Sequence, residues 1–342
     1  MSQKKWINDD HIIQEKIQSF VSEFGFDQTD VLENMISTLV KMFKDNRFDS
    51  ADLKIVDQTL IEFRNSFRTF YPYRDSRKIC IFGSARTATD HPEYIMAEQF
   101  AHHITRKGFM IITGAGGGIM EAGNKGADVN KSFGVNINLP FEQEPNAYIR
   151  GDSKCISYNY FFNRKLTFIK ESDGVVLCPG GFGTHDECFE VLTLIQTGRC
   201  SPRPIVLLSQ PGNTYWTDWI SFIQHQLVEK EYVSGRDISL FHLSHSANDA
   251  AGYISQFYSR YHSIRYIDNL AVIRMKKALP ETALSAIPTD FPNLCTDGIC
   301  EQFAPGKYFK DDHFPDKYRL VFSFNKKDYS DLIELIHFIN QA

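Results

Sequence analysis

The sequence has no apolar run close to the ~20 residues that a membrane-spanning helix needs, which argues against a membrane protein. It also lacks an apolar signal core, because its first residues are polar and lead into a helical pattern. The seven cysteines include no CxxC pair, and their scattered positions and odd number fit neither a disulfide framework nor a zinc site. We therefore expect a cytoplasmic protein in a reducing compartment.

An excess of positive charge is absent as well. Lys and Arg number 37 against 42 Asp and Glu, which gives a formal net charge of −5. This balance argues against nucleic acid as a partner bound through bulk electrostatics, although it leaves room for a local basic pocket. The pairs His102-His103 and His242/His245 lack HExxH spacing and acidic neighbours, so we expect surface histidines and no metal. No motif points to a cofactor or to a serine nucleophile.

Three regions of the chain differ in their hydrophobic pattern. Residues 1–75 carry apolar residues at helical spacing, which predicts three helices in an N-terminal helical region. Residues 76–262 alternate strand and helix signals, and residues 263–342 combine strand-like and helix-like segments. We expect an α/β fold, with a Rossmann-like, doubly wound parallel sheet in the middle region and a small α+β domain at the C-terminus.

Five strands are predicted in the middle region, at residues 78–82, 109–113, 134–139, 174–178 and 204–209. Helices are predicted at residues 94–107, 119–128, 158–171, 184–197 and 216–229. In the last region we expect strands at 270–275 and 318–324 and helices at 280–287 and 329–339. Three of the five strands in the middle region end in glycine turns, so three loops can converge on one ligand site at the carboxyl ends of the strands.

The glycine-rich loop at residues 114–118 fits neither common phosphate-binding motif. A G-x-G-x-x-G fingerprint needs glycine at position 119, which is Ile119, and a P-loop fails because Asn124 separates Gly123 from the following lysine. The loop can contact a ligand closely, or it can simply be a tight turn before a well-packed helix. Four glycines in five residues favour ligand contact.

The most informative stretch is residues 178–187, where a predicted strand meets a glycine-rich turn and then a helix. Such a turn presents backbone N–H groups and a helix N-terminus to an anion, typically a phosphate. Thr184 and Glu187 also have the spacing of a capping box, in which Glu187 would bond only to the backbone. The glycines before Thr184 favour a carboxylate beside a phosphate site.

Glu190 lies one helical turn after Glu187, so both carboxylates are expected on the same side of the helix. Paired carboxylates beside a phosphate suit cleavage at the anomeric carbon of a sugar. His185 is close enough to titrate in the same site. Arg164 either belongs to a solvated basic face or, among its apolar neighbours, pairs with a carboxylate or phosphate.

Together these motifs resemble the Lonely Guy (LOG) family of nucleoside 5′-monophosphate phosphoribohydrolases. The family signature P-G-G-x-G-T-x-x-E matches residues 179–187 at every fixed position, and the upstream pair is Arg164-Lys165. Gly83-Ser84 and the run at 114–120 complete the likeness, which covers about residues 76–240. The flanking regions are similar to those of the larger bacterial members.

The resemblance implies hydrolysis of a nucleotide such as AMP to the free base and ribose 5-phosphate. It implies Arg164 and Glu187 as catalytic residues and a homodimer or higher homo-oligomer. It also implies a substrate-binding set, which consists of Ser84, Gly116, Gly117, Gly118, Gly180, Gly181, Gly183, Thr184 and Glu190. Two alternatives stay open: a nucleotide or cofactor carrier without turnover, and a sensor of nucleotide pools regulated through its flanking regions.

Overall fold

The computed structural model describes residues 3–23, 25, 29–44, 47–139, 144–295, 298–309 and 313–342. By internal packing the chain forms two compact units, Met1–Ile61 and Glu62–Ala342. The division into domains at residues 75 and 262 stays a prediction. No helix in the described part of the chain is long and apolar enough to cross a membrane.

The first unit consists of the helices α1 (Gln3–Ser22) and α2 (Thr29–Lys44) and the beginning of α3 (Ser50–Phe70). Ile17 and Val21 of α1 are buried. The start of α3 is fixed by Asp49, whose carboxylate accepts hydrogen bonds from the backbone N–H groups of Ala51 at 2.7 Å and Asp52 at 2.9 Å. These bonds satisfy donors that a helix start otherwise leaves free. The expectation of helices in this region is confirmed.

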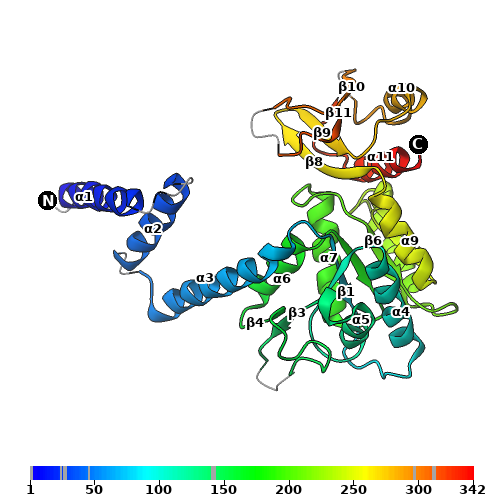
Figure 1. Ribbon diagram of the computed structural model, residues 1–342, viewed down its shortest axis with the longest axis horizontal. Coiled ribbons are helices and arrows are strands. Elements are labelled where there is room, and N and C mark those ends of the chain that lie inside the picture. The colour runs from blue at the N-terminus through cyan, green and yellow to red at the C-terminus, as the bar shows by residue number, and fades with distance from the viewer. Residues whose placement is uncertain are drawn as a thin grey trace. The chain divides into compact units, whose positions relative to one another are not determined.

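Seven strands of the second unit's described residues form one parallel sheet, shown in Figure 1. In sheet order they are β4 (Cys155–Tyr158), β3 (Ser132–Ile137), β2 (Met110–Thr113), β1 (Lys78–Phe82), β5 (Gly174–Leu177), β6 (Ile205–Leu208) and β7 (His242–Ser244). The order reverses at β1, because the chain adds strands on one side as far as β4 and then crosses to β5. The expected Rossmann-like, doubly wound fold is confirmed.

Helices connect these strands and cover the sheet. They are α4 (Pro92–Arg106), α5 (Ile119–Ala127), α6 (Phe161–Glu171), α7 (Phe182–Gln196), α8 (Tyr215–Ile223) and α9 (Ala247–Phe257). The sheet core is apolar on both faces, as parallel sheets require, and all residues of β1, β2, β3, β5 and β6 are buried.

Several predicted boundaries are wrong. The helix expected from residue 158 begins at Phe161, because Tyr158 instead ends β4, paired with Ile137. The helix expected to reach residue 229 ends at Ile223 and passes into a π-helical turn, Gln224–Val228. The edge strands β4 and β7 are missing from the prediction because they are short and carry polar residues that give no continuous apolar run.

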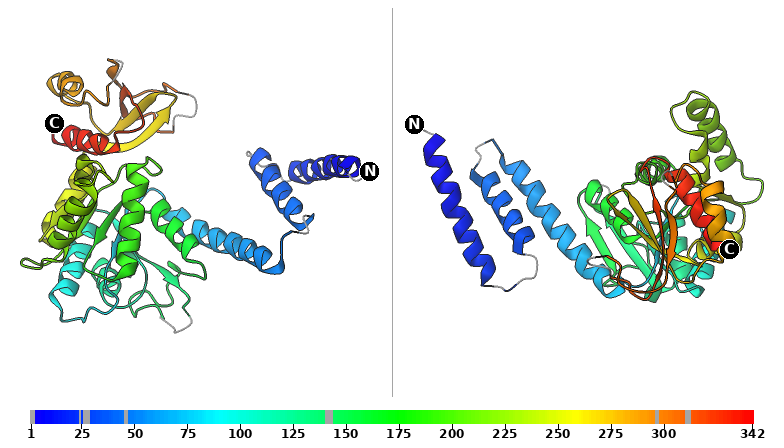
Figure 2. Two further views of the ribbon diagram at one scale, coloured as in Figure 1. Left: turned by 180° about the vertical axis from the view of Figure 1, so that it is seen from behind. Right: turned by 90° about the horizontal axis from the view of Figure 1, so that it is seen from above.

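The C-terminal part of the second unit is α+β, as expected. Its described residues form a four-stranded antiparallel sheet in the order β10 (Cys300–Phe303), β11 (Tyr318–Ser323), β9 (Leu270–Met275) and β8 (Tyr261–Ile267), with helices α10 (Glu281–Asp290) and α11 (Tyr329–Gln341). In Figure 2, α11 lies next to α9 and so joins this sheet to the α/β part. Strands β8 and β10 are half-buried and polar, which explains why the pattern does not predict them.

The loops after β1, β2 and β5 meet, as expected for neighbouring parallel strands. The backbone N–H of Ser84 donates to the carbonyl of Pro179 at 3.1 Å, and that of Ile119 donates to the carbonyl of Ser84 at 3.0 Å. Gly118 has φ +62°, and a Cβ there would lie 2.3 Å from the carbonyl oxygen of Ser84. Glycine is therefore required where the loop after β2 approaches the loop after β1.

Candidate active site

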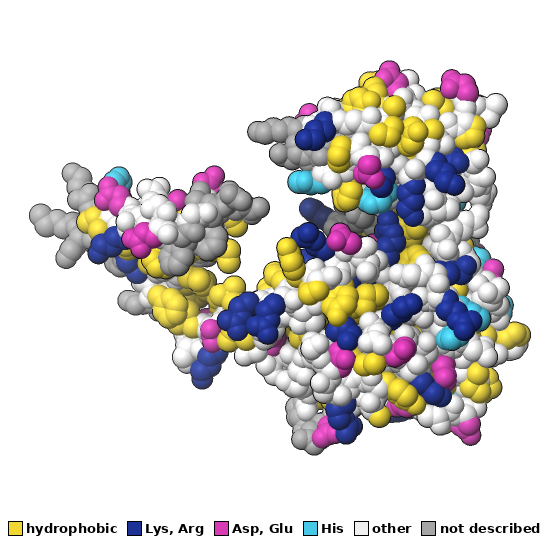
Figure 3. Space-filling view, in the orientation of Figure 1, with side chains coloured by type: hydrophobic (Ala, Val, Ile, Leu, Met, Phe, Trp, Pro, Cys, Tyr) yellow, Lys and Arg dark blue, Asp and Glu magenta, His cyan; other side chains and the backbone are white. Residues whose placement is uncertain are grey.

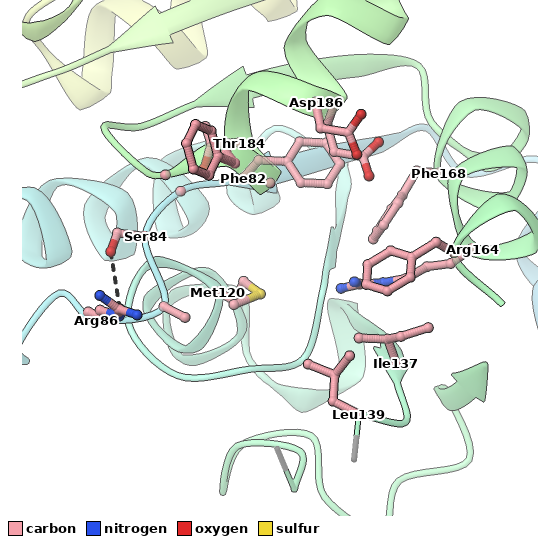
Figure 4. Close-up of a pocket in the computed structure, with 17 residues that line it drawn as sticks. Phe82, Ser84, Arg86, Met120, Ile137, Leu139, Arg164, Phe168, Thr184 and Asp186 are labelled. Atoms are coloured by element: carbon pink, nitrogen blue, oxygen red, sulfur yellow. Dashed lines mark hydrogen bonds between the residues drawn. The ribbon is translucent and has the colours of Figure 1, made fainter. Parts of the chain in front are cut away.

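A cavity of about 610 Å³ opens at the carboxyl ends of the central strands. Its wall combines the loop after β1, the end of β3, the helix α6 and the start of α7. Figure 4 shows Arg164 and Asp186 on one side of the cavity, Ser84 and Arg86 on the other, and Met120 between them. This is the topological switch point of the sheet, where α/β folds place their ligands.

The glycine-rich turn after β5 leads directly into α7, with Gly181 as the N-cap residue. The carbonyl of Gly181 accepts from the N–H groups of Thr184 and His185, at 3.1 and 3.3 Å. Gly181 and Gly183 are exposed and have open space where a Cβ would stand, whereas a Cβ at Gly180 would lie 2.1 Å from Oγ1 of Thr184. The turn thus leaves backbone at the start of α7 open to an anion.

The capping-box alternative for Thr184 and Glu187 is wrong. The helix begins two residues before Thr184, no side chain caps it, and Thr184 is buried within the first turn. The carboxylate of Glu187 turns instead toward the cavity and toward Lys165 on α6.

Glu187 is the most perturbed carboxylate of the cavity wall. Its side chain is buried, with Oε1 3.5 Å from Nζ of Lys165 and Oε2 lacking a hydrogen-bond partner among the described residues. Burial raises the pKa of Glu187 to about 7, with Lys165 opposing and Glu190 adding to the shift. A carboxyl group with this pKa exists in both protonation states near neutral pH, as a group that exchanges protons must.

Lys165 links three carboxylates of α7. Its Nζ lies 2.7 Å from Glu190, 3.0 Å from Asp186 and 3.5 Å from Glu187. Burial alone would lower the pKa of Lys165, but its hydrogen bond to Glu190 and the charge of Glu187 raise it overall. Sequence reasoning did not select Lys165, although its place directly after Arg164 in the R-K pair was a usable signal.

Arg164 is half-buried and belongs to no solvated face. Its Nε donates to the carbonyl of Val135 at 2.9 Å and its Nη2 to that of Gly114 at 3.3 Å. The guanidinium lies 5.2 Å from the ring centroid of Phe168. Burial lowers the pKa of Arg164, and the carboxylate of Glu187 favours its charged form. The solvated-face alternative is therefore wrong, while pairing of Arg164 with a carboxylate or phosphate stays a prediction, since its hydrogen bonds go to backbone carbonyls.

The structure brings together Ser84, Arg164, Gly181, Gly183, Thr184 and Glu187 in the cavity wall. The other predicted site residues are not part of this wall. Gly180 packs on Thr184, Glu190 binds Lys165, and Gly118 supports Ser84. Gly116 and Gly117 belong to the loop after β2, whose carbonyl at Gly116 accepts from Asn146 at 2.9 Å. Sequence reasoning missed the apolar part of the wall, which comprises Phe82, Met120, Ile137, Leu139, Phe161 and Phe168.

His185 faces away from the cavity and stabilises the glycine turn from behind. The hydroxyl of Tyr215 donates to the carbonyl of Gly180 at 2.6 Å and therefore accepts from Nε2 of His185 at 2.8 Å. Burial lowers the pKa of His185 and so favours its neutral ring. Among the described residues, no group of three or more His, Cys, Asp or Glu could hold a metal ion.

Comparisons with known proteins identify sequences and structures that are similar to this chain. Residues 115–254 match the family described as "Possible lysine decarboxylase". The cytokinin riboside 5′-monophosphate phosphoribohydrolase LOG2 of Arabidopsis thaliana is 26% identical over 161 residues, 46% of this chain and 73% of the relative. The cytokinin riboside 5′-monophosphate phosphoribohydrolase of Rhodococcoides fascians is 34% identical over 89 residues, 26% of this chain and 43% of the relative.

A solved structure, the molybdenum cofactor carrier protein of Chlamydomonas reinhardtii, is 20% identical with a TM-score of 0.37, over 53% of this chain and 97% of that one. The second unit itself has a Rossmann-like domain with a glycine-rich turn and a buried carboxylate at the carboxyl ends of its central strands. The family match and the two sequence relatives support membership of this chain in the Lonely Guy (LOG) family.

Proposed function

We propose that this protein hydrolyses the N-glycosidic bond of a purine nucleoside 5′-monophosphate such as AMP, releasing the free base and ribose 5-phosphate. One observation carries the proposal: the buried carboxyl of Glu187, with a pKa near 7, lies beside the exposed glycine turn that begins α7. A phosphate group held on that turn brings the sugar of the same nucleotide within reach of Glu187.

The cavity offers complementary surfaces for the parts of a nucleotide. The backbone at Gly181 and Gly183 and the side chains of Ser84 and Arg86 would bind the phosphate. The apolar wall around Met120 and Phe168 would receive the base. A cavity of about 610 Å³ is in the size range of small-molecule sites.

In the proposed reaction the bond between C1′ and the base nitrogen breaks, and its electron pair leaves with the base. The sugar ring acquires oxocarbenium character, which the carboxylate of Glu187 stabilises by charge. Water adds its oxygen to C1′ and loses one proton, which Glu187 accepts and the departing base finally receives. Atoms balance, since nucleotide plus water gives base plus ribose 5-phosphate.

Arg164 and Lys165 have different parts in this scheme. Arg164 is fixed by Val135 and Gly114 and directs positive charge toward the cavity, where it keeps part of the Glu187 population ionised. Lys165 does not line the cavity and acts as a positioning residue, because it holds the carboxylates of Asp186, Glu187 and Glu190 together. Glu190 likewise has a positioning role, because it binds Lys165 and does not line the cavity.

We also propose a cytoplasmic homodimer or higher homo-oligomer. All seven cysteines are free thiols, which supports a reducing compartment. Phe161, Phe162 and Leu166 of α6 are about half exposed and Phe182 is 96% exposed, all at or beside the cavity mouth. A second copy of the chain is the proposed occupant of this apolar face, because a dimer of the kind that the family resemblance implies would cover it. Light scattering after size exclusion would test it, and a monomer at micromolar concentration would contradict it.

The deciding experiment incubates the protein with AMP and separates adenine and ribose 5-phosphate by chromatography. Turnover is expected for wild type and for Glu229→Gln, an exposed control directly after the π-helical turn that follows α8, and its loss is expected for Glu187→Gln. Equal rates in Glu187→Gln and wild type would refute the mechanism. Tight AMP binding without turnover would favour the carrier alternative instead.

A further inference from the structure

A second cavity, of about 560 Å³, lies at the opposite end of the parallel sheet from the candidate active site. It is enclosed by the residues that lead into β1, β5 and β6 and by the C-terminal sheet, where His262 belongs to β8 and Lys276 follows β9. Figure 3 shows Lys and Arg side chains gathered around the hollow between these two parts.

The wall of this cavity is strongly basic. It contains five Lys or Arg residues, namely Arg74, Arg77, Lys170, Arg203 and Lys276, against two acids, Asp75 and Asp173. Asp173 is already engaged by Arg77 at 2.8 Å and by the backbone N–H of Lys78 at 2.9 Å. Asp75 is 97% exposed and 3.9 Å from Arg74, so water screens most of its charge. Lys170 is paired with Glu171 outside the wall, so the cations without a matching acid are Arg203 and Lys276, with Arg74 only weakly compensated.

The excess of positive charge in the wall affects the pKa values of His262 and Lys276. Burial lowers the pKa of His262 to about 4, and the charges of Arg77, Lys317, Lys276 and Arg274 act in the same direction. Burial lowers the pKa of Lys276 as well, again with Arg77 and Lys317 contributing. Cations held this close repel one another, and a bound anion would relieve that repulsion.

We propose that this cavity is a binding site for an anion that carries two or more phosphate groups. The guanidinium of Arg77 is preorganised over the ring of Tyr258, 3.7 Å from its centroid, and Arg74 and Lys276 are exposed at the cavity. Arginine forks and a lysine ammonium together match the oxygen atoms of a polyphosphate chain. Phe314, also in the wall, offers a partly exposed aromatic face that a nucleoside attached to that chain could contact.

The site is connected to the candidate active site through two elements. Nη1 of Arg203 donates to the carbonyls of Ile169 at 2.8 Å and Ser172 at 2.7 Å, at the end of the helix that carries Arg164 and Lys165. Asp173 directly precedes β5, whose other end leads to the glycine turn. An anion that binds Arg203 or Arg77 would shift the contacts that these side chains make at the end of α6 and the start of β5. It could thereby alter activity at the candidate active site, an effect that rests on the proposed function.

Isothermal titration calorimetry with sodium tripolyphosphate tests the site directly. Excess ribose 5-phosphate is present throughout, so that the turn at α7 is occupied. We expect saturable binding to wild type and a loss of affinity of about tenfold or more in Arg74→Gln/Lys276→Gln, because two charged contacts are removed. Each single variant should show part of the loss. The matched control is Arg68→Gln/Lys277→Gln, which removes the same charges from neighbouring positions outside the cavity wall.

Equal affinity in the double variant and its control, or no binding of tripolyphosphate to wild type, would overturn the proposal. A parallel titration with ATP separates the two sources of the ligand. Tighter binding of ATP than of tripolyphosphate assigns a nucleoside polyphosphate, and equal binding assigns inorganic polyphosphate; both support the site. Binding confined to a single-stranded oligonucleotide would refute it. Basal AMP hydrolysis without effector should be the same in both double variants, which separates this test from that of the proposed function.

Discussion

A Cβ atom on Gly114 would lie 2.2 Å from Nη2 of Arg164, and the carbonyl of Gly114 itself accepts a hydrogen bond from that nitrogen at 3.3 Å. The loop after β2 therefore positions the guanidinium of Arg164. This close approach is possible only because residue 114 has no side chain. This relationship gives the glycine-rich loop a function that differs from direct ligand contact.

Gly114→Ala should therefore impair catalysis by displacing the guanidinium of Arg164. We expect kcat/KM for AMP to fall by about 100-fold, the effect of a misplaced active-site group. Steady-state kinetics with circular dichroism measures the change and checks the fold. Gly252→Ala on α9 is the control, since a Cβ there meets open space. Kinetics unchanged from wild type in Gly114→Ala would contradict this role.

Glu187→Gln should reduce kcat for AMP hydrolysis by about 100- to 10,000-fold, the range expected when a general acid–base group is lost. AMP affinity should change little, because the proposed phosphate contacts come from the glycine turn and from Ser84 and Arg86. Single-turnover kinetics and equilibrium binding would separate the two effects. Loss of binding with an unchanged rate at saturation would assign Glu187 to substrate affinity alone.

Lys165→Met should shift the pH dependence of hydrolysis. The positive charge of Lys165 lowers the pKa of Glu187, so its removal raises that pKa above the present value of about 7. Because the proposed mechanism uses ionised Glu187, activity is lost as pH falls through this pKa, and the acid limb of the profile should move to higher pH. Lys170→Met, whose lysine lies at the other end of α6, is the control. An unshifted acid limb would argue against contact between Lys165 and Glu187 in solution.

Glu187→Gln should also stabilise the folded protein above neutral pH. The pKa of this carboxyl rises from 4.5 to about 7 on folding, so the folded state binds the proton more tightly. Stability is therefore retained below pH 4.5 and falls as pH rises through 7, by up to about 3 kcal/mol. Thermal unfolding of both proteins at pH 5 and pH 8 measures the difference. A larger gain in melting temperature at pH 5 than at pH 8 would contradict the expected sign.

Tyr215→Phe should weaken substrate binding more than turnover. Its hydroxyl fixes the carbonyl of Gly180 and orients His185, so its removal loosens the turn that would hold the phosphate without touching Glu187. We expect KM to rise by about tenfold, equivalent to one lost hydrogen bond. Tyr232→Phe, at a residue that is 74% exposed, serves as the control. A fall in kcat with unchanged KM would contradict a role of Tyr215 in substrate binding.

Much of this molecule follows from local sequence pattern. Continuous apolar runs predict β1, β2, β3, β5 and β6, and helical periodicity predicts helices in both units, although α9 is not among the predicted ones. The edge strands β4 and β7 do not follow, because their short, polar segments become strands only by pairing with β3 and β6. The helix expected from residue 158 starts later for the same reason, since pairing overrides propensity at Tyr158.

The sequence by itself determined the parallel α/β architecture and the three converging glycine turns, because periodicity and turn chemistry are local properties. The resemblance of its motifs to the LOG family, and not periodicity, selected Arg164 and Glu187 as catalytic candidates. Only the tertiary structure decided which of these groups share a cavity. It placed Lys165 among three carboxylates, left Glu190 and Gly118 outside the cavity wall, and excluded the capping role of Glu187. Burial and charge proximity between segments far apart in the chain set the pKa of Glu187, and no local pattern encodes them.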